Sequence, residues 1–121
     1  MGRQFIVGTG TMVARVLLAK GGHVPLHSHV NEQITYILSG ALKFLMHEGG
    51  GSHGDSTPRE VVVREVIVHA GEVLCIPPSV PHEAFALEDT VDLDIFNPPR
   101  QDWIDGTDAY LRNQSAPEPK S

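Results

Sequence analysis

The chain of 121 residues has a single cysteine, few aromatic residues and no long hydrophobic run. The lone cysteine, Cys75, cannot form an internal disulfide, so nothing in the sequence indicates an oxidising compartment. No run approaches the ~20 apolar residues that a membrane-spanning helix requires. The start of the chain lacks the continuous apolar stretch and small-residue cleavage site of a secretion signal. We therefore expect a soluble, cytoplasmic protein with no membrane partner.

Basic residues are also scarce, since 9 lysines and arginines stand against 15 aspartates and glutamates, for a net charge of -6. A negatively charged surface repels the phosphate backbone, so nucleic acid is not an expected partner. The 12 glycines and 9 prolines predict frequent turns and few long helices. Histidine, in contrast, is abundant with seven residues, and these are the first candidates for a functional site.

The apolar runs are short, rich in β-branched residues and bounded by Gly, Pro or polar turns, which is typical of strands. Runs at this spacing predict an all-β fold, in which two antiparallel sheets form a sandwich or barrel. We expect a single domain over residues 1–121, with its core at about 10–100. The predicted strands are 11–18, 34–38, 41–46, 61–68, 72–76, 82–87 and 91–96.

Two segments lack a strand pattern. Residues 48–60 are rich in glycine and polar residues, and we expect an exposed loop that joins the strands on either side. The C-terminal segment 101–121 opens with a short amphipathic piece around Trp103, which we expect to be a packing anchor. It ends in a polar tail that we expect to fray.

A His-x-His pair suggests a metal site. In an extended strand, residues i and i+2 point to the same face, so His27 and His29 can both reach one ion. Gln33 follows four residues later, and His82 comes directly after a proline-rich turn. Three neutral imidazoles and one amide oxygen suit Zn, Ni, Fe, Mn or Co, and not Ca or Mg. Without further motifs, such a pair more often consists of two solvated or hydrogen-bonded side chains.

Other residues with reactive or titratable side chains have weaker patterns. Cys75 alternates with Leu74 and Ile76, which predicts a buried small hydrophobic residue and not a nucleophile. Glu32 is expected to point away from its neighbour Gln33, because adjacent strand residues face opposite sides. We expect surface or turn positions for the remaining histidines, His23, His47, His53 and His69.

Two stretches resemble the two motifs of the cupin superfamily. The first runs Gly21-x5-His27-x-His29-x3-Gln33-x6-Gly40, and the second runs Gly71-x5-Pro77-x4-His82. The resemblance implies a single-domain jelly-roll barrel that holds a divalent transition metal through His27, His29, Gln33 and His82. The fourth ligand position usually carries glutamate, and Ser79 stands where the second motif usually has glycine.

Acidic residues occupy one face of the last predicted strand. Asp92, Asp94 and Phe96 alternate there, and a carboxylate inside a barrel is costly unless it is paired or used. Arg100 follows a stiff Asn-Pro-Pro segment. It can pair with Asp94 as a structural ion pair, or it can bind the carboxylate of a substrate in bidentate fashion.

A narrower resemblance covers residues 91–103 and 33–40. The pattern Asp94-x-Phe96-x-Pro98-x-Arg100-Gln101-Asp102 looks like the C-terminal signature of KdgF-type cupins. That family acts in uronate catabolism and converts unsaturated uronates into linear keto forms. The resemblance implies a metal-dependent isomerase in which Asp94 transfers a proton, Arg100 binds the carboxylate of the sugar acid and Phe96 lines the pocket. A neutral glutamine ligand leaves the dication more exposed, which favours Lewis-acid chemistry.

Three alternatives remain open at this point. The same ligands serve metal-dependent dioxygenases, a binding module could hold a small acid without chemistry, and a structural cupin could lack a metal. The expected partner in the first two cases is a small molecule, such as a carboxylate or sugar acid. Apolar residues on both faces of strands, such as 61–63 and 66–68, indicate a homodimer that buries one outer sheet.

Overall fold

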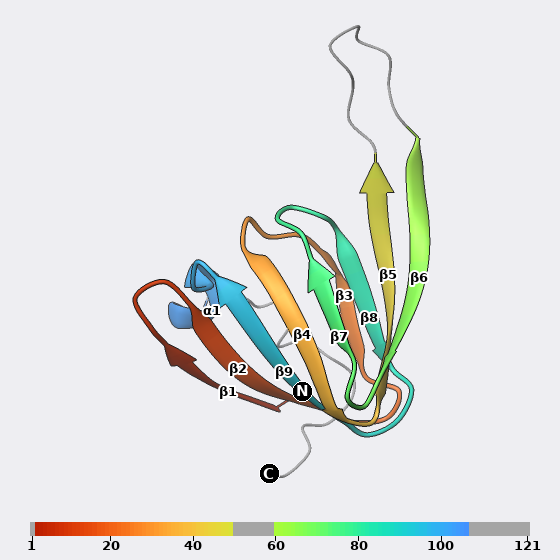
Figure 1. Cartoon of the computed structure of the whole chain (residues 1–121), viewed down its shortest axis with the longest axis horizontal. Helices are drawn as coiled ribbons and strands as arrows, with labels where there is room; N and C mark the ends of the chain where they lie inside the picture. The colour runs from red at the N-terminus through yellow and green to blue at the C-terminus, as the bar shows by residue number, and fades with distance from the viewer. Residues whose placement is uncertain (1, 50–59, 107–121) are drawn as a thin grey trace, which may run out of the picture.

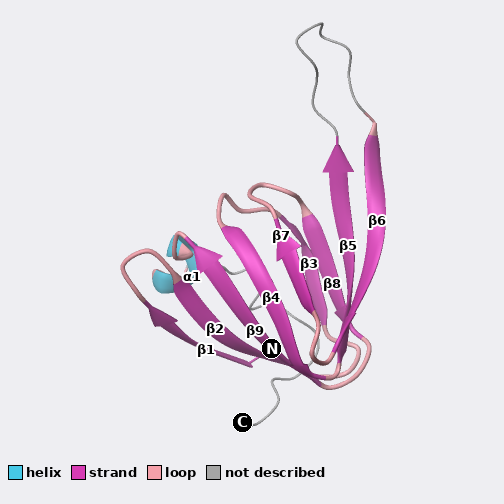
Figure 2. Cartoon of the chain, in the orientation of Figure 1, coloured by secondary structure: helices cyan, strands magenta, loops and turns pink. Residues whose placement is uncertain are grey.

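The computed structural model describes residues 2–49 and 60–106, and most of them lie in two antiparallel β-sheets (Figure 1, Figure 2). One sheet has the strand order β1-β2-β9-β4-β7, and the other has the order β3-β8-β5-β6. The prediction of an all-β fold with two antiparallel sheets is confirmed. The strands are β1 (Gly2–Val7), β2 (Met12–Leu18), β3 (His23–His27), β4 (Glu32–Ser39), β5 (Ala41–Gly49), β6 (Val61–His69), β7 (Val73–Ile76), β8 (His82–Ala86) and β9 (Thr90–Asn97).

Alternation of side chains fills the space between the sheets. Along β2 every second residue is buried, because a strand sends successive side chains to opposite faces. The alanines of β8 follow the same rule, with Ala84 and Ala86 both buried beside His82. The buried apolar cluster consists of Met12, Ala14, Val16, Leu18, Ile37, Leu42, Phe44, Met46, Val68, Ile76, Ala84, Ala86, Phe96 and Trp103.

In strand β9 the acidic side chains face inward and apolar side chains face outward, the reverse of an ordinary amphipathic strand. Its buried positions include Asp92 and Asp94, whereas Leu93 and Ile95 lie half-buried on the outer face. The strand lies between β2 and β4, so its carboxyl groups project from the inner face of the five-stranded sheet near its centre. Polar side chains in this position point to a functional site, because burial of a carboxylate without a role is costly.

The pairing register places the polar side chains of β4 next to those of β9. Thr35 pairs with Asp94, and Gln33 pairs with Phe96. On the facing sheet, His82 of β8 pairs with His27 of β3. Two strands that are far apart in sequence therefore supply each half of the candidate site.

Two strands, β1 and β3, are absent from the sequence prediction. β1 lies at the edge of its sheet with Ile6 and Val7 exposed, so it has no alternating pattern. β3 also lies at a sheet edge, and it contains Pro25, a residue that only edge strands or bulges tolerate. Neither strand has the alternation of buried and exposed residues by which strands are predicted from sequence, so both were missed.

The two segments without a strand pattern are only partly described. β5 and β6 pair in register as far as Gly49 opposite Val61. Residues 48 and 49 of the predicted loop 48–60 therefore belong to β5, and its residues 50–59 lie outside the described part of the chain. In the C-terminal segment a short helix, α1 (Gln101–Ile104), buries Trp103 as expected, and the predicted tail lies outside the described residues.

The prediction for Cys75 is wrong, because this residue is exposed. Its neighbour Ile76 is fully buried, and alternation along β7 therefore sends the thiol to the outer face of the sheet. Glu32, in contrast, is exposed while Gln33 is buried, as expected. In the described ranges no helix is long and apolar enough to cross a membrane.

Gly40 makes the turn between β4 and β5, and it provides a test of the fold. Its φ of +86° is left-handed, and a Cβ there would lie 2.8 Å from Thr90 Cα and would overlap the Asp89 carbonyl oxygen. Gly71 has a similar φ of +84° but no neighbour within 4 Å, so it is the matched control.

We expect Gly71→Ala to lower the free energy of unfolding by about 1–2 kcal/mol. Gly40→Ala should lower it by a further ~1–3 kcal/mol, measured by urea denaturation. Equal losses for the two variants would contradict the packing described here.

Candidate metal centre

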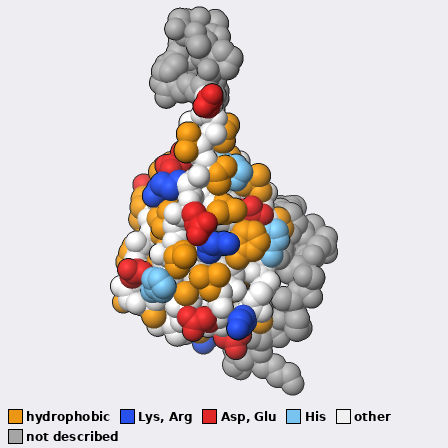
Figure 3. Space-filling view, turned by 90° about the vertical axis from the view of Figure 1, so that its right-hand side faces the viewer, with side chains coloured by type: hydrophobic (Ala, Val, Ile, Leu, Met, Phe, Trp, Pro, Cys, Tyr) orange, Lys and Arg blue, Asp and Glu red, His pale blue; other side chains and the backbone are white. Residues whose placement is uncertain are grey.

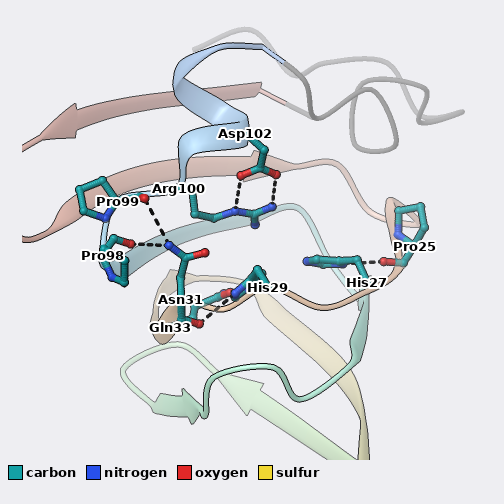
Figure 4. A network of polar contacts seen from close by, with 9 residues as sticks. All are labelled: Pro25, His27, His29, Asn31, Gln33, Pro98, Pro99, Arg100 and Asp102. Atoms are coloured by element: carbon teal, nitrogen blue, oxygen red, sulfur yellow. Dashed lines mark hydrogen bonds and ion pairs between the residues drawn. The ribbon is translucent and has the colours of Figure 1, made fainter.

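Three imidazoles converge at one end of the barrel. His27 ends β3, His29 lies just after it, and His82 begins β8. Their candidate ligand atoms all lie within 4.8 Å of one another. Figure 4 shows His27 and His29 reaching from this stretch of chain into the space below Arg100. The sequence prediction that these histidines share one location is confirmed, although His29 lies outside the strand that was expected to orient it.

Each of the three rings is oriented by a backbone carbonyl two residues away. The Nδ1 atoms of His27, His29 and His82 lie 2.7, 2.9 and 2.8 Å from the carbonyl oxygens of Pro25, Asn31 and Val80. A carbonyl only accepts a hydrogen bond, so each Nδ1 carries the proton. The Nε2 lone pair of each neutral ring is then available to a metal ion, as in metal sites whose histidines are held by outer hydrogen bonds.

The loop that presents His29 is braced from two sides. Ser79 has a φ of 65°, and its backbone N–H donates to the His29 carbonyl oxygen at 2.8 Å. A left-handed φ explains why glycine is usual at this position in the motif. Asn31 is buried, and its side-chain amide donates to the carbonyl oxygens of Pro98 and Pro99. The same residue thus connects the His29 ring with the segment that precedes Arg100 (Figure 4).

Gln33 supplies an oxygen atom to this cluster. Its amide nitrogen donates to Thr35 Oγ1 at 2.9 Å and lies 3.3 Å from Asp94 Oδ1, so its Oε1 points the other way. Oε1 lies 3.1 Å from the Nε2 atom of His29. Because Nδ1 of that ring already holds the proton, two lone pairs face each other. A cation bound by both atoms satisfies this arrangement, so the residues fit a divalent transition metal.

The histidines of the cluster are poor bases. Burial lowers the pKa of His82 to about 3 and that of His27 to about 4, because the protonated ring loses its hydration. The pKa of His29 is lowered by burial and by the positive charge of Arg100. The rings therefore remain neutral at physiological pH, which is the form that binds metals.

Asp92 and Asp94 form a hydrogen-bonded pair of carboxyl groups behind the cluster. Burial and the negative charge of Asp94 raise the pKa of Asp92 well above its usual value. Burial also raises the pKa of Asp94, but hydrogen bonds from Asp92, Thr35 and Gln33 oppose that shift. Asp92 is thus the member that holds the proton, and Asp94 accepts donors from several sides.

Arg100 is paired with Asp102 and not with Asp94. Its Nε and Nη2 atoms lie 3.0 and 2.6 Å from the two carboxylate oxygens of Asp102, a bidentate geometry. The guanidinium is buried, and its centre lies 5.4 Å from the Phe96 ring and 4.9 Å from the Trp103 ring. The sequence left two roles open for Arg100, and the buried ion pair that the structure shows is the one with Asp102. A spacing of two residues lets Asp102 reach the guanidinium from the start of α1.

A cavity of about 40 Å³ connects these groups. At one end it is lined by the metal-cluster residues His27, Gln33 and His82, and Arg100 also faces it. Its volume accepts about three water molecules or the end of a slender ligand. The other lining residues are Val16, Leu18, Val24, Leu42, Phe44, Ala84, Asp92, Asp94, Phe96 and Trp103.

Sequence reasoning identified most but not all residues of this network. Thr35 was missed, although its i+2 spacing from Gln33 places it on the same face and was a usable signal. Asn31 gave no signal, because its role depends on a contact with residues 67 positions away. His23 was expected at a surface or turn position; it lies in β3, part-buried, with Nε2 2.6 Å from Glu83 Oε2.

Together, the two antiparallel sheets and the histidine cluster between them define a small β-barrel protein with a candidate site for a metal ion. The family model of the cupin domain matches residues 14–97, which is more than half of the chain. The protein belongs to the cupin family. A comparison with curated proteins finds no match.

Several solved structures share the fold. KdgF from Halomonas sp. is 24% identical with a TM-score of 0.64, and the match covers 84% of this chain and 81% of that one. An RmlC-like cupin from Shewanella frigidimarina is 24% identical with a TM-score of 0.63, covering 84% and 78%. Oxalate decarboxylase from Bacillus subtilis, which has Mn(II) centres, is 19% identical with a TM-score of 0.58, covering 74% of this chain and 21% of that chain.

The low basicity of the histidines leads to a prediction for the metal-free protein. In an NMR titration of the ring protons, we expect His82 to titrate near pH 3 and His27 near pH 4. Because both pKa values lie below 6.5, protons should compete with a metal ion only in acid, and metal affinity should stay constant from pH 8 to about 6. Titration of either ring near pH 6.5 would contradict the burial and the carbonyl hydrogen bonds described above.

Proposed function

We propose that the protein is a metal-dependent isomerase that converts an unsaturated uronate, or a similar sugar acid, into its keto form. The supporting observation is that two imidazoles of the cluster, His27 and His82, line one cavity together with Asp94 and Arg100. These are a candidate Lewis-acid site, a buried carboxyl group and a fixed positive charge. The C-terminal pattern from Asp94 to Asp102 resembles that of KdgF-type cupins and supports the same substrate class.

In this proposal His27, His29, Gln33 and His82 hold a divalent transition metal, which can be Zn, Ni, Fe, Mn or Co. Such an ion polarises a carbonyl or hydroxyl oxygen of the substrate. The glutamine contributes no charge, so the ion keeps its full Lewis acidity. The hydrogen bonds from Gln33 to Thr35 and Asp94 fix the side chain with its oxygen toward the histidines.

Arg100 is proposed to bind the carboxylate of the sugar acid. Its bidentate pair with Asp102 holds the guanidinium plane, and Phe96 and Trp103 flank it. Asp102 offsets part of the positive charge, and burial strengthens the attraction for an anion that remains, because little water screens it. Phe96 lines the cavity beside it and limits the ways in which the acid can lie.

Asp94 is proposed to transfer the proton. Conversion of a cyclic unsaturated uronate into its linear keto form is a net isomerisation. The hemiacetal hydroxyl loses its proton as a carbonyl forms, the ring C–O bond breaks, and one proton adds to the alkene carbon that does not bear the ring oxygen. One carboxyl group can therefore serve as acceptor and donor. Hydrogen bonds from Thr35 and Gln33 hold this carboxyl in place. A carboxyl group in such a position typically contributes about 10²–10⁴-fold to the rate.

The test is the rate at which the protein consumes an unsaturated uronate, followed by ultraviolet absorbance. We expect Asp94→Ala to lose about 10²–10⁴-fold in rate while its metal content per chain stays equal to that of the parent. Asp105→Ala changes an exposed carboxylate outside the cavity, and it should keep the full rate. No acceleration by the metal-loaded parent, or full activity of Asp94→Ala, would contradict the proposal. Oxygen consumption with a phenolic or thiol substrate would favour a dioxygenase instead.

The runs 61–63 and 66–68, which suggested a homodimer, lie in β6 of the four-stranded sheet, where the exposed Arg64 and Glu65 interrupt the apolar side chains. We also propose that two copies of the chain pair through the outer face of the other, five-stranded sheet. Tyr36 lies between Val73 and Leu93 in the pairing register, and all three side chains are on this face. Seen from the β6 side, by comparison, hydrophobic side chains are mixed with histidines and with charges of both signs (Figure 3). Arg15 of the neighbouring strand β2 pairs with Leu93 on the outer face of the five-stranded sheet, so that face is mainly apolar with a charge beside its centre. A mainly apolar surface is typical of homodimer interfaces.

Sedimentation of the purified protein tests the dimer. We expect a dimer for the parent and a monomer for Tyr36→Glu, because a carboxylate at the centre of an apolar interface is not solvated. Ile67→Glu is the matched control, because Ile67 is exposed on the other sheet. This variant should remain a dimer. A parent protein that sediments as a monomer would contradict the proposed interface.

A further inference from the structure

Asp92 is a buried carboxyl group that the proposed mechanism does not use. Its side chain is 3% exposed, and its Oδ1 atom has no hydrogen-bond partner among the described residues. The group is hydrogen-bonded to Asp94, so it is anchored on one side only. An acceptor atom in this state is unfavourable in the isolated protein, because it has lost water without gaining another donor.

The register places Asp92 on the far side of Asp94 from the metal cluster. Along β9 the inward residues run from Phe96, which pairs with Gln33, through Asp94, which pairs with Thr35, to Asp92. Each step of two residues advances roughly 7 Å along a strand. Asp92 pairs with Val16 of β2 and Ile37 of β4, so its neighbours at this level are apolar.

The same cavity reaches from the metal cluster to this position. Asp92 lines it together with the apolar side chains of Val16, Leu18, Val24, Leu42 and Ala84. These five side chains carry no hydrogen-bond donor, so a molecule in the cavity, water or ligand, can supply the donor that Oδ1 lacks. The small volume of about 40 Å³ favours an open chain over a ring at this depth.

We propose that Asp92 is a specificity-determining residue whose Oδ1 atom accepts a hydrogen bond from a hydroxyl group of an open-chain hydroxy acid. The carboxylate of this ligand lies toward Arg100, and its hydroxyl lies several bonds away at the apolar end of the cavity. The inference takes the ligand class, an acid with hydroxyl groups, from the proposed function. It does not depend on the reaction, because it concerns binding alone.

The first experiment compares two ligands that differ by one hydroxyl group. Calorimetry measures the binding of 4-hydroxybutyrate and of butyrate to the metal-loaded protein. We expect 4-hydroxybutyrate to bind about tenfold more tightly, because its hydroxyl satisfies a buried acceptor that butyrate leaves unpaired. Equal affinities for the two acids would overturn the inference, and this comparison needs no variant.

Two variants then assign the preference to Asp92. In Asp92→Asn the amide can donate to Asp94 while its oxygen still accepts from the ligand, so the preference for 4-hydroxybutyrate should persist. In Asp92→Leu, which has a similar volume and no acceptor, the two affinities should become equal. A preference retained by Asp92→Leu would show that the hydroxyl binds elsewhere and would overturn the inference. Melting temperature and metal content establish that each variant is folded.

This test is separate from that of the proposed reaction. A protein that prefers 4-hydroxybutyrate but does not accelerate the loss of an unsaturated uronate supports the role of Asp92 and contradicts the proposed isomerase. A protein that turns over the uronate with equal affinities for the two acids supports the isomerase and contradicts the role of Asp92.

Discussion

The alternation of side chains along β9 determines both the inner and the outer face at the centre of the five-stranded sheet. A strand has only two faces, so sending Asp92 and Asp94 into the barrel sends Leu93 and Ile95 outward. The inward face gives the cavity its carboxyl pair, in the centre of the five-stranded sheet. The outward face adds apolar side chains to a surface that already has Tyr36 and Val73. The candidate site and the proposed dimer surface thus have one common origin in the register of a single strand.

The candidate metal centre and the carboxyl pair form one hydrogen-bonded unit. Backbone carbonyls hold the proton of each imidazole on Nδ1, which leaves Nε2 toward the centre. Gln33 connects the two parts, since its oxygen faces His29 and its nitrogen faces Asp94. Glutamate at this position would place a second negative charge beside Asp94, which a neutral amide avoids. The departure of this chain from the usual cupin motif therefore suits the carboxylate that lies next to it.

Sequence patterns predicted those features of the fold and the site that depend on the spacing of residues along the chain and on alternation along a strand. The two motifs located His27, His29 and His82 correctly, and alternation placed Asp92 and Asp94 on one inward face. What could not be predicted depends on contacts between distant segments. The bond from Asn31 to Pro98 and the choice of Asp102 as the partner of Arg100 are set by how the C-terminal segment lies against the barrel. Cys75 was misplaced because a run of three apolar residues does not tell which one faces outward, and only the burial of Ile76 decides it.

We propose that three imidazoles and the oxygen of Gln33 hold one metal ion. X-ray absorption at the edge of the bound metal, recorded on the zinc- or cobalt-loaded protein, tests this ligand set. We expect multiple-scattering features of three imidazole rings and a further light ligand at about 2.0–2.2 Å. Gln33→Glu should retain the three rings, because their orientation depends on backbone carbonyls and not on this side chain. A spectrum with one imidazole or none would contradict the site as described.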